Sequence, residues 1–148
     1  MNLFYELILV VRNSELVIMD RPSFEILVQN SLQKLPRSFK KKLANIAVVV
    51  EELPSQELLK NMGIRSGKLL GLYQGVPLTK RGWNYGNMLP DRIVIYQRTI
   101  ESVAASAEAI EKIVQDTVIH EIGHYFGFSD NELREMGDSK RRGKRLRK

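Results

Sequence analysis

The sequence contains no cysteine and only two histidines among its 148 residues. Without cysteine, the chain has no disulfide framework, no thiolate metal site and no cysteine nucleophile. Because disulfides belong mainly to oxidising compartments, this composition is consistent with a cytoplasmic protein, and we expect that location. A metal site in this chain must complete its ligand set with carboxylates, since two histidines alone do not fill the coordination sphere.

Long hydrophobic runs are also missing. The apolar N-terminal stretch LFYELILVV is interrupted by Glu6 and is far shorter than the roughly 20 residues of a membrane span. It has no basic start and no small-residue cleavage site, which argues against a signal peptide. We therefore expect no association with a membrane.

The net charge of +6 is unevenly distributed. The last ten residues, SKRRGKRLRK, hold seven Lys or Arg and no acid, which leaves residues 1–138 with a formal charge of −1. We predict a disordered basic tail at 139–148. Contact between this tail and a nucleic acid is an alternative that the near-neutral remainder of the chain does not favour.

Helical and strand patterns alternate along the rest of the chain, whose length suits one domain. Residues 3–19 are predicted to be extended. The predicted strands are Ile46–Glu51, Leu69–Tyr73 and Arg92–Gln97, rich in β-branched residues. The predicted helices are Pro22–Leu35, Ser38–Leu43, Ser55–Met62, Glu108–Phe126 and a last one that opens with a capping box at Ser129–Glu132. This order indicates an α+β fold with one small, twisted, mixed sheet and helices packed mainly on one face.

The stretch HEIGHYFGFSD, residues 120–130, carries both histidines of the chain. His120 and His124 are four residues apart on the predicted helix, so their imidazoles share a face and can hold one divalent cation. His120, His124 and the adjacent Glu121 all fall within the apolar stripe of that helix, where buried ionisable groups require a partner. Glu121 is rotated away from the ligand pair, which suits a general base acting on metal-bound water. The stripe consists of Ile110, Ile113, Val114, Val118 and Ile122.

The third metal ligand is predicted to be Asp130. Gly127 can adopt positive φ and turn the chain back toward the histidines. Glu132, Glu135 and Asp138 are less favoured because no turn delivers them so directly. Two alternatives stay open: Asp130 caps the last helix instead, and Gly123 either permits a close approach or is merely tolerated.

The longer stretch HEIGHYFGFSDNELREMG resembles the signature His-Glu-x-x-His-x-x-Gly-x-x-Asp of small bacterial zincin-like metallopeptidases, or minimal zincins. The resemblance continues upstream through LLGLYQGVPLTKRG and LPDRIVIYQRTI and covers about residues 20–138. It implies a compact zincin-like domain with a long active-site helix, Zn²⁺ held by His120, His124 and Asp130, and Glu121 as general base. Residues 1–19 are then an N-terminal extension, read either as an additional element on the sheet or as sequence upstream of a start at Met19.

Three functions are compatible with these features. The first is a zinc-dependent peptidase acting on a peptide or protein, with the loop at residues 75–90 shaping specificity and Tyr73, Tyr85 or Tyr96 assisting an oxyanion. The second is a metal-dependent ribonuclease resembling bacterial rRNA-maturation proteins, whose spacing is related; the glutamate after the first histidine and the aspartate in place of a final histidine disfavour it. The third is a metal-stabilised binding module without turnover, motivated by the small size of the domain.

Overall fold

The computed structural model describes residues 18–64, 69–82 and 91–135. The predicted extended segment at 3–17, residues 83–90 of the predicted loop, Met136, Asp138 and the basic tail at 139–148 lie outside the described residues. The domain boundaries drawn from the sequence therefore stay predictions.

Two helices precede the sheet. α2 (Arg21–Gln33) begins with Pro22 in its first turn and buries Phe24, Val28 and Ser31 on one face. Pro36 follows its end, and α3 (Arg37–Leu43) starts directly after that proline. Both helices were predicted from the sequence, and both are confirmed.

Three strands form one mixed sheet. β1 (Ala47–Glu51) runs parallel to β3 (Arg92–Tyr96), and β2 (Gly71–Gln74) runs antiparallel to β3, so that the order is β1-β3-β2. The central strand β3 is buried from Ile93 to Tyr96, which explains its unbroken apolar sequence. β2 forms one edge of this sheet, and that edge borders the site described below. The three strands lie where the sequence placed them.

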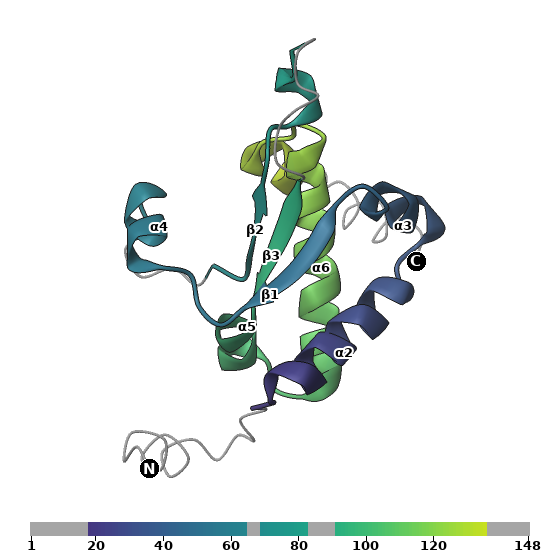
Figure 1. Ribbon diagram of the computed structural model, residues 1–148, viewed down its shortest axis with the longest axis vertical. Helices are drawn as coiled ribbons and strands as arrows, with labels where there is room; N and C mark the ends of the chain where they lie inside the picture. The colour runs from purple at the N-terminus through teal and green to yellow at the C-terminus, as the bar shows by residue number, and fades with distance from the viewer. Residues whose placement is uncertain (1–17, 65–68, 83–90, 136–148) are drawn as a thin grey trace.

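Two further helices follow elements of the sheet. α4 (Gln56–Asn61) is capped by Ser55, whose side chain accepts a hydrogen bond from the Leu58 N–H as expected, and it stands away from the sheet (Figure 1). α5 (Gln97–Val103) follows β3 without a break and was not predicted. Its sequence QRTIESV has moderate helix propensity, with β-branched Thr and Ile. Burial of Gln97 and Glu101 and their bonds to the backbone of Met19 favour this helix instead.

The long helix α6 (Ala107–Tyr125) packs along the sheet and is contacted by α2, α3 and α5 (Figure 1). Its predicted apolar stripe is confirmed, since Ile110, Val114, Val118 and Ile122 are at most 1% exposed. β2 crosses α6 closely at Gly71, where a Cβ would lie 2.6 Å from Cγ2 of Thr117. No helix in the described part of the chain has the length and hydropathy needed to span a bilayer.

Candidate metal centre

His120 and His124 lie on the last turns of α6 with their ring nitrogens facing each other. The two Nε2 atoms are 3.1 Å apart, and the rings are nearly perpendicular at 79°. Their side chains are 44% and 26% exposed. The sequence had suggested that the histidines lie within the buried face of α6. They lie instead at the border of that face. A ligand can reach both rings at this border.

The C-terminus of α6 reverses the chain through a Schellman motif. The Phe128 N–H donates to the carbonyl of Gly123 at 3.0 Å, and the Gly127 N–H donates to that of His124 at 2.9 Å. Gly127 has a φ of +90°, as its predicted role requires. The side chain of Thr79 also occupies the space that a Cβ on Gly127 would need, with Oγ1 2.4 Å from that position. The turn therefore depends on glycine twice, for its backbone angle and for this contact.

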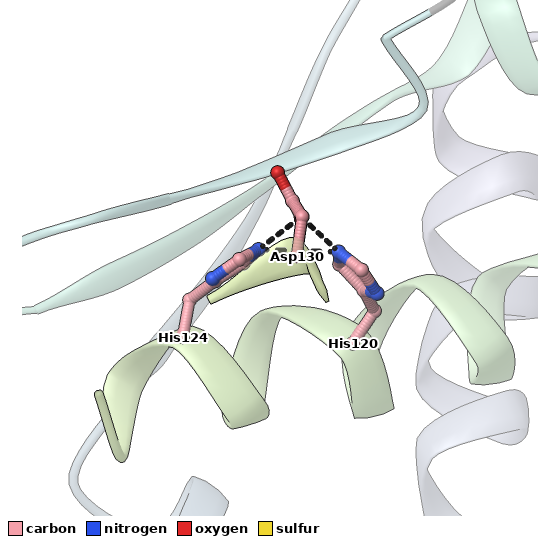
Figure 2. A group of neighbouring side chains, drawn as sticks. All are labelled: His120, His124 and Asp130. Atoms are coloured by element: carbon pink, nitrogen blue, oxygen red, sulfur yellow. Dashed lines mark hydrogen bonds and ion pairs between the residues drawn. The ribbon is translucent and has the colours of Figure 1, made fainter. Parts of the chain in front are cut away.

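Asp130 is brought back over the histidines by this turn. Its Oδ1 lies 3.0 Å from Nε2 of His120 and 3.0 Å from Nε2 of His124 (Figure 2). Residues 130–135 are helical, and Ser129 caps them: the Glu132 N–H donates to Ser129 Oγ at 3.3 Å, and the Ser129 N–H donates to the Glu132 carboxylate at 2.7 Å. This is the predicted capping box. Ser129 caps the helix, so the carboxylate of Asp130 is left to face the imidazoles.

These three atoms form a nearly equilateral triangle that fits a zinc ion. Its sides are 3.0, 3.0 and 3.1 Å, whereas zinc bonds of about 2.0 Å in tetrahedral geometry separate ligand atoms by about 3.3 Å. Nδ1 of His124 lies 2.8 Å from the Phe128 carbonyl, which can only accept, so Nδ1 carries the proton and the Nε2 lone pair faces the triangle. Two imidazoles and one carboxylate are a zinc donor set that leaves a fourth position open.

The ionisation of Asp130 suits this role. Desolvation acts to raise its pKa, but the hydrogen bond with His120 and the charges of both imidazoles outweigh it and hold the pKa below its ordinary value. The carboxylate is therefore ionised at neutral pH, which is the form that binds a cation.

Glu121 follows His120 but turns toward the sheet. It is 6% exposed, and its Oε2 accepts a hydrogen bond from the Tyr73 N–H of β2 at 2.7 Å. Burial raises the pKa of Glu121, opposed by that hydrogen bond and by the charges of the two imidazoles. Its carboxylate is not one of the three groups that converge. A buried carboxyl group with a raised pKa beside a candidate cation site is a candidate general base.

Two pockets adjoin His120. One, of about 350 Å³, lies between β2 and α6 and is lined by Leu69, Leu70, Gly71, Asp116, Thr117, His120 and Glu121. The other, of about 310 Å³, is mostly apolar and is lined by Phe39, Lys42, Asp116, Ile119, His120, Ile122, Gly123, Phe126, Phe128 and Leu133. Asp116 and His120 belong to both linings. The two pockets therefore meet on the face of α6 that carries the histidines.

Two contacts of the site were not foreseen, and both involve the backbone. The Phe128 carbonyl orients His124, and the Tyr73 N–H holds Glu121. Gly127 signals the first indirectly, because a turn at that point folds the following carbonyl back toward the helix. The second leaves no local signal, since Tyr73 and Glu121 are 48 residues apart.

The three tyrosines considered for an oxyanion differ in placement. Tyr96 is 1% exposed on the central strand, and Tyr85 lies outside the described residues. Tyr73 packs edge-on to Tyr125 with ring centroids 5.8 Å apart, and burial raises its pKa to about 12. Its hydroxyl therefore keeps its proton at neutral pH. An oxyanion role for any of them stays a prediction.

Together, the fold and the triangle of donor atoms define a small α+β domain built around a His-Glu-x-x-His helix. The family model of zincin-like metallopeptidases matches residues 43–139, and the chain belongs to that family. The matched range includes all of the candidate site residues. A solved structure, a conserved hypothetical protein from Thermus thermophilus, is 26% identical to this chain, and the similarity covers 72% of this chain and 92% of that one with a TM-score of 0.47. No curated protein matches.

Proposed function

We propose that the protein is a zinc-dependent peptidase. The observation that carries the proposal is the convergence of His120, His124 and Asp130 within 3.1 Å of one another, beside a carboxylate that stays outside the triangle. This separation of three binding groups from one basic group is what hydrolysis by a zincin requires.

Each group has one task in this proposal. His120, His124 and Asp130 hold the ion, and the Phe128 carbonyl keeps the His124 ring oriented. Bound zinc supplies Lewis acidity, which activates water and polarises a carbonyl group. The Glu121 carboxylate accepts the proton of the attacking water and passes it to the leaving amine. Burial raises the pKa of this carboxyl above its ordinary value, which makes the carboxylate a stronger base than an exposed glutamate.

The edge of β2 is the proposed binding surface for the substrate. The Leu70 carbonyl accepts from Tyr96 in β3, whereas the Tyr73 N–H donates to Glu121 on the other side. Backbone groups alternate in direction along an antiparallel pair, so those of Gly71 face outward together with those of Tyr73. An extended peptide can pair with this edge and place a peptide bond over the pocket that Gly71 and Glu121 line.

The remaining assignments belong to the same proposal. The substrate is a peptide or protein, the site of action is the cytoplasm, and the basic tail is not needed for peptide hydrolysis. The loop that follows β2 approaches the metal centre, since Thr79 packs against Gly127. This contact favours a role for that loop in shaping the substrate cleft.

A peptide library tests the proposal. Zinc-loaded wild-type protein should cut library peptides, and Glu121→Gln should not. An RNA fragment incubated with the same preparations distinguishes the ribonuclease alternative. RNA cleavage without peptide cleavage, or equal peptide cleavage by both proteins, would refute the proposed function.

A further inference from the structure

The second pocket beside His120 is mostly apolar. Its walls come from three helical segments and their ends: Phe39 of α3, Ile119 of α6 with Phe126 at its C-cap, and Leu133 of the helix at residues 130–135. A volume of about 310 Å³ accommodates one large apolar side chain. Burying a Leu- or Phe-sized group there strengthens a complex by about 10- to 100-fold.

The pocket also carries a cation at its edge. The Lys42 ammonium lies 4.7 Å from the centroid of the Phe126 ring and 5.3 Å from that of Phe39. Among the described residues, no carboxylate forms an ion pair with Lys42. The rest of α3, whose sequence is RSFKKKL, adds Arg37, Lys40 and Lys41 and no acid. An anionic group that approaches the α3 side of this pocket therefore meets several positive charges.

The acidic residue on the pocket wall does not cancel that field. Asp116 forms an ion pair with Lys112 at 2.6 Å on the same helix. Asp116 and His120 also line the pocket beneath β2. When a peptide lies along β2 and over the metal centre, a side chain next to the reacting bond can therefore enter this apolar pocket.

From these features we infer a specificity subsite: the pocket between α3 and α6 receives a large apolar side chain of the substrate, and Lys42 selects an acidic residue beside it. This inference rests on the proposed peptidase function. It names the preferred substrate as a peptide in which a Leu- or Phe-like residue adjoins Asp or Glu.

Peptide binding, measured without turnover, tests the subsite. Fluorescence anisotropy on zinc-loaded Glu121→Gln would compare three peptides, all acetylated and amidated so that no terminal carboxylate contributes. One carries Phe beside Glu, the second Ala beside Glu, and the third Phe beside Lys. We expect the Phe-Glu peptide to bind about 10- to 100-fold more tightly than the Ala-Glu peptide. It should bind at least about threefold more tightly than the Phe-Lys peptide, and this second ratio should fall at high salt.

Three substitutions in the Glu121→Gln background locate the effect. Lys42→Glu should weaken the Phe-Glu peptide and improve the Phe-Lys peptide. Lys41→Glu changes the net charge equally on the same helix, at an exposed position that does not line the pocket, and should have the smaller effect. Ile119→Trp should fill the pocket and abolish the preference for Phe over Ala, with the melting temperature as a check of folding.

The outcomes separate the subsite from the proposed function. If wild type cuts peptides but shows no preference for Phe-Glu, or if Lys41→Glu matches Lys42→Glu, the subsite is wrong while the peptidase stands. If wild type cuts nothing but the binding preferences and their response to Lys42→Glu hold, the subsite stands and the peptidase does not. Absence of binding for all three peptides overturns the subsite.

Discussion

The backbone N–H of Tyr73 in β2 donates a hydrogen bond of 2.7 Å to the side chain of Glu121 in α6. This bond joins the edge of the sheet to the candidate general base. It also leaves the second oxygen of the carboxylate for a proton, because a carboxylate offers two acceptor atoms. The position of the base therefore depends on how β2 packs against α6, which the close approach of Gly71 to Thr117 sets.

Glu121→Gln should retain zinc and the fold but lose hydrolysis. The Gln side-chain oxygen can accept the same hydrogen bond from Tyr73, so the contact between β2 and α6 survives. The amide cannot act as a base, and loss of general-base catalysis lowers kcat by about 10²–10⁴-fold. Elemental analysis, thermal melting and peptide cleavage provide the readouts. The matched control is Glu108→Gln in the first turn of α6, an exposed change of equal charge that should leave zinc content and cleavage unaltered and lower the melting temperature only slightly.

Asp130→Ala and Ser129→Ala should separate metal binding from helix capping. Removal of Asp130 deletes one of three converging donors, so zinc affinity should fall by at least about 100-fold, and activity with it. Removal of the Ser129 hydroxyl should cost about 1 kcal/mol of stability and leave zinc binding largely intact. Zinc titration and melting temperature on both variants decide the matter. If Ser129→Ala loses the metal and Asp130→Ala keeps it, the assignment of Asp130 is wrong.

The sequence was informative about this site where its signals are local. The stripe from Ile110 to Ile122 predicted α6, Gly127 predicted its end, and Ser129 with Glu132 predicted the capping box that follows. Each of these depends on side chains within a few residues of one another, so periodicity and turn chemistry are sufficient.

The features that were missed depend on contacts between distant residues. α5 forms although QRTIESV is not a strong helix sequence, because its buried Gln97 and Glu101 hydrogen-bond the backbone of Met19, about 80 residues away. The hydrogen bond between the Tyr73 N–H and Glu121 also joins residues that are far apart in the sequence. The purpose of Gly123 was also left open, because its neighbour Leu133 belongs to the following helix. Local propensity carries no information about such packing.

Removal of zinc should destabilise the protein without unfolding it. The three candidate ligands join α6 to the following helix, and the metal binds only when both are in place. Zinc at 100 times its Kd adds about 2.7 kcal/mol, which for a chain of this size raises Tm by about 5–10 °C. The hydrophobic side chains packed between the sheet and α6 do not include any of the three candidate ligands, so this core should persist. Melting curves with and without a chelator test this, and Asp130→Ala should show a much smaller difference between the two.

Gly123→Ala tests whether the packing of the last helix places Asp130. A Cβ at this position would lie 2.4 Å from Cδ2 and 3.0 Å from Cδ1 of Leu133. Alanine favours a helix over glycine by about 1 kcal/mol, so the melting temperature is a poor readout here, because the helix gain opposes the cost of the clash. Zinc affinity is the better one. Since Leu133 lies three residues after Asp130 on the same short helix, moving it shifts the carboxylate, and we expect affinity to fall about 10- to 100-fold, as it does when a supporting contact of a metal ligand is lost.

Leu133→Ala in the same chain removes the atoms that the new methyl group of Gly123→Ala meets, so the double variant should recover most of the lost zinc affinity. Leu133→Ala alone serves as the control for loss of the leucine. If Gly123→Ala binds zinc as tightly as wild type, the helix is positioned by the Gly127 turn and the Ser129 cap, and Gly123 is not required for the placement of Asp130.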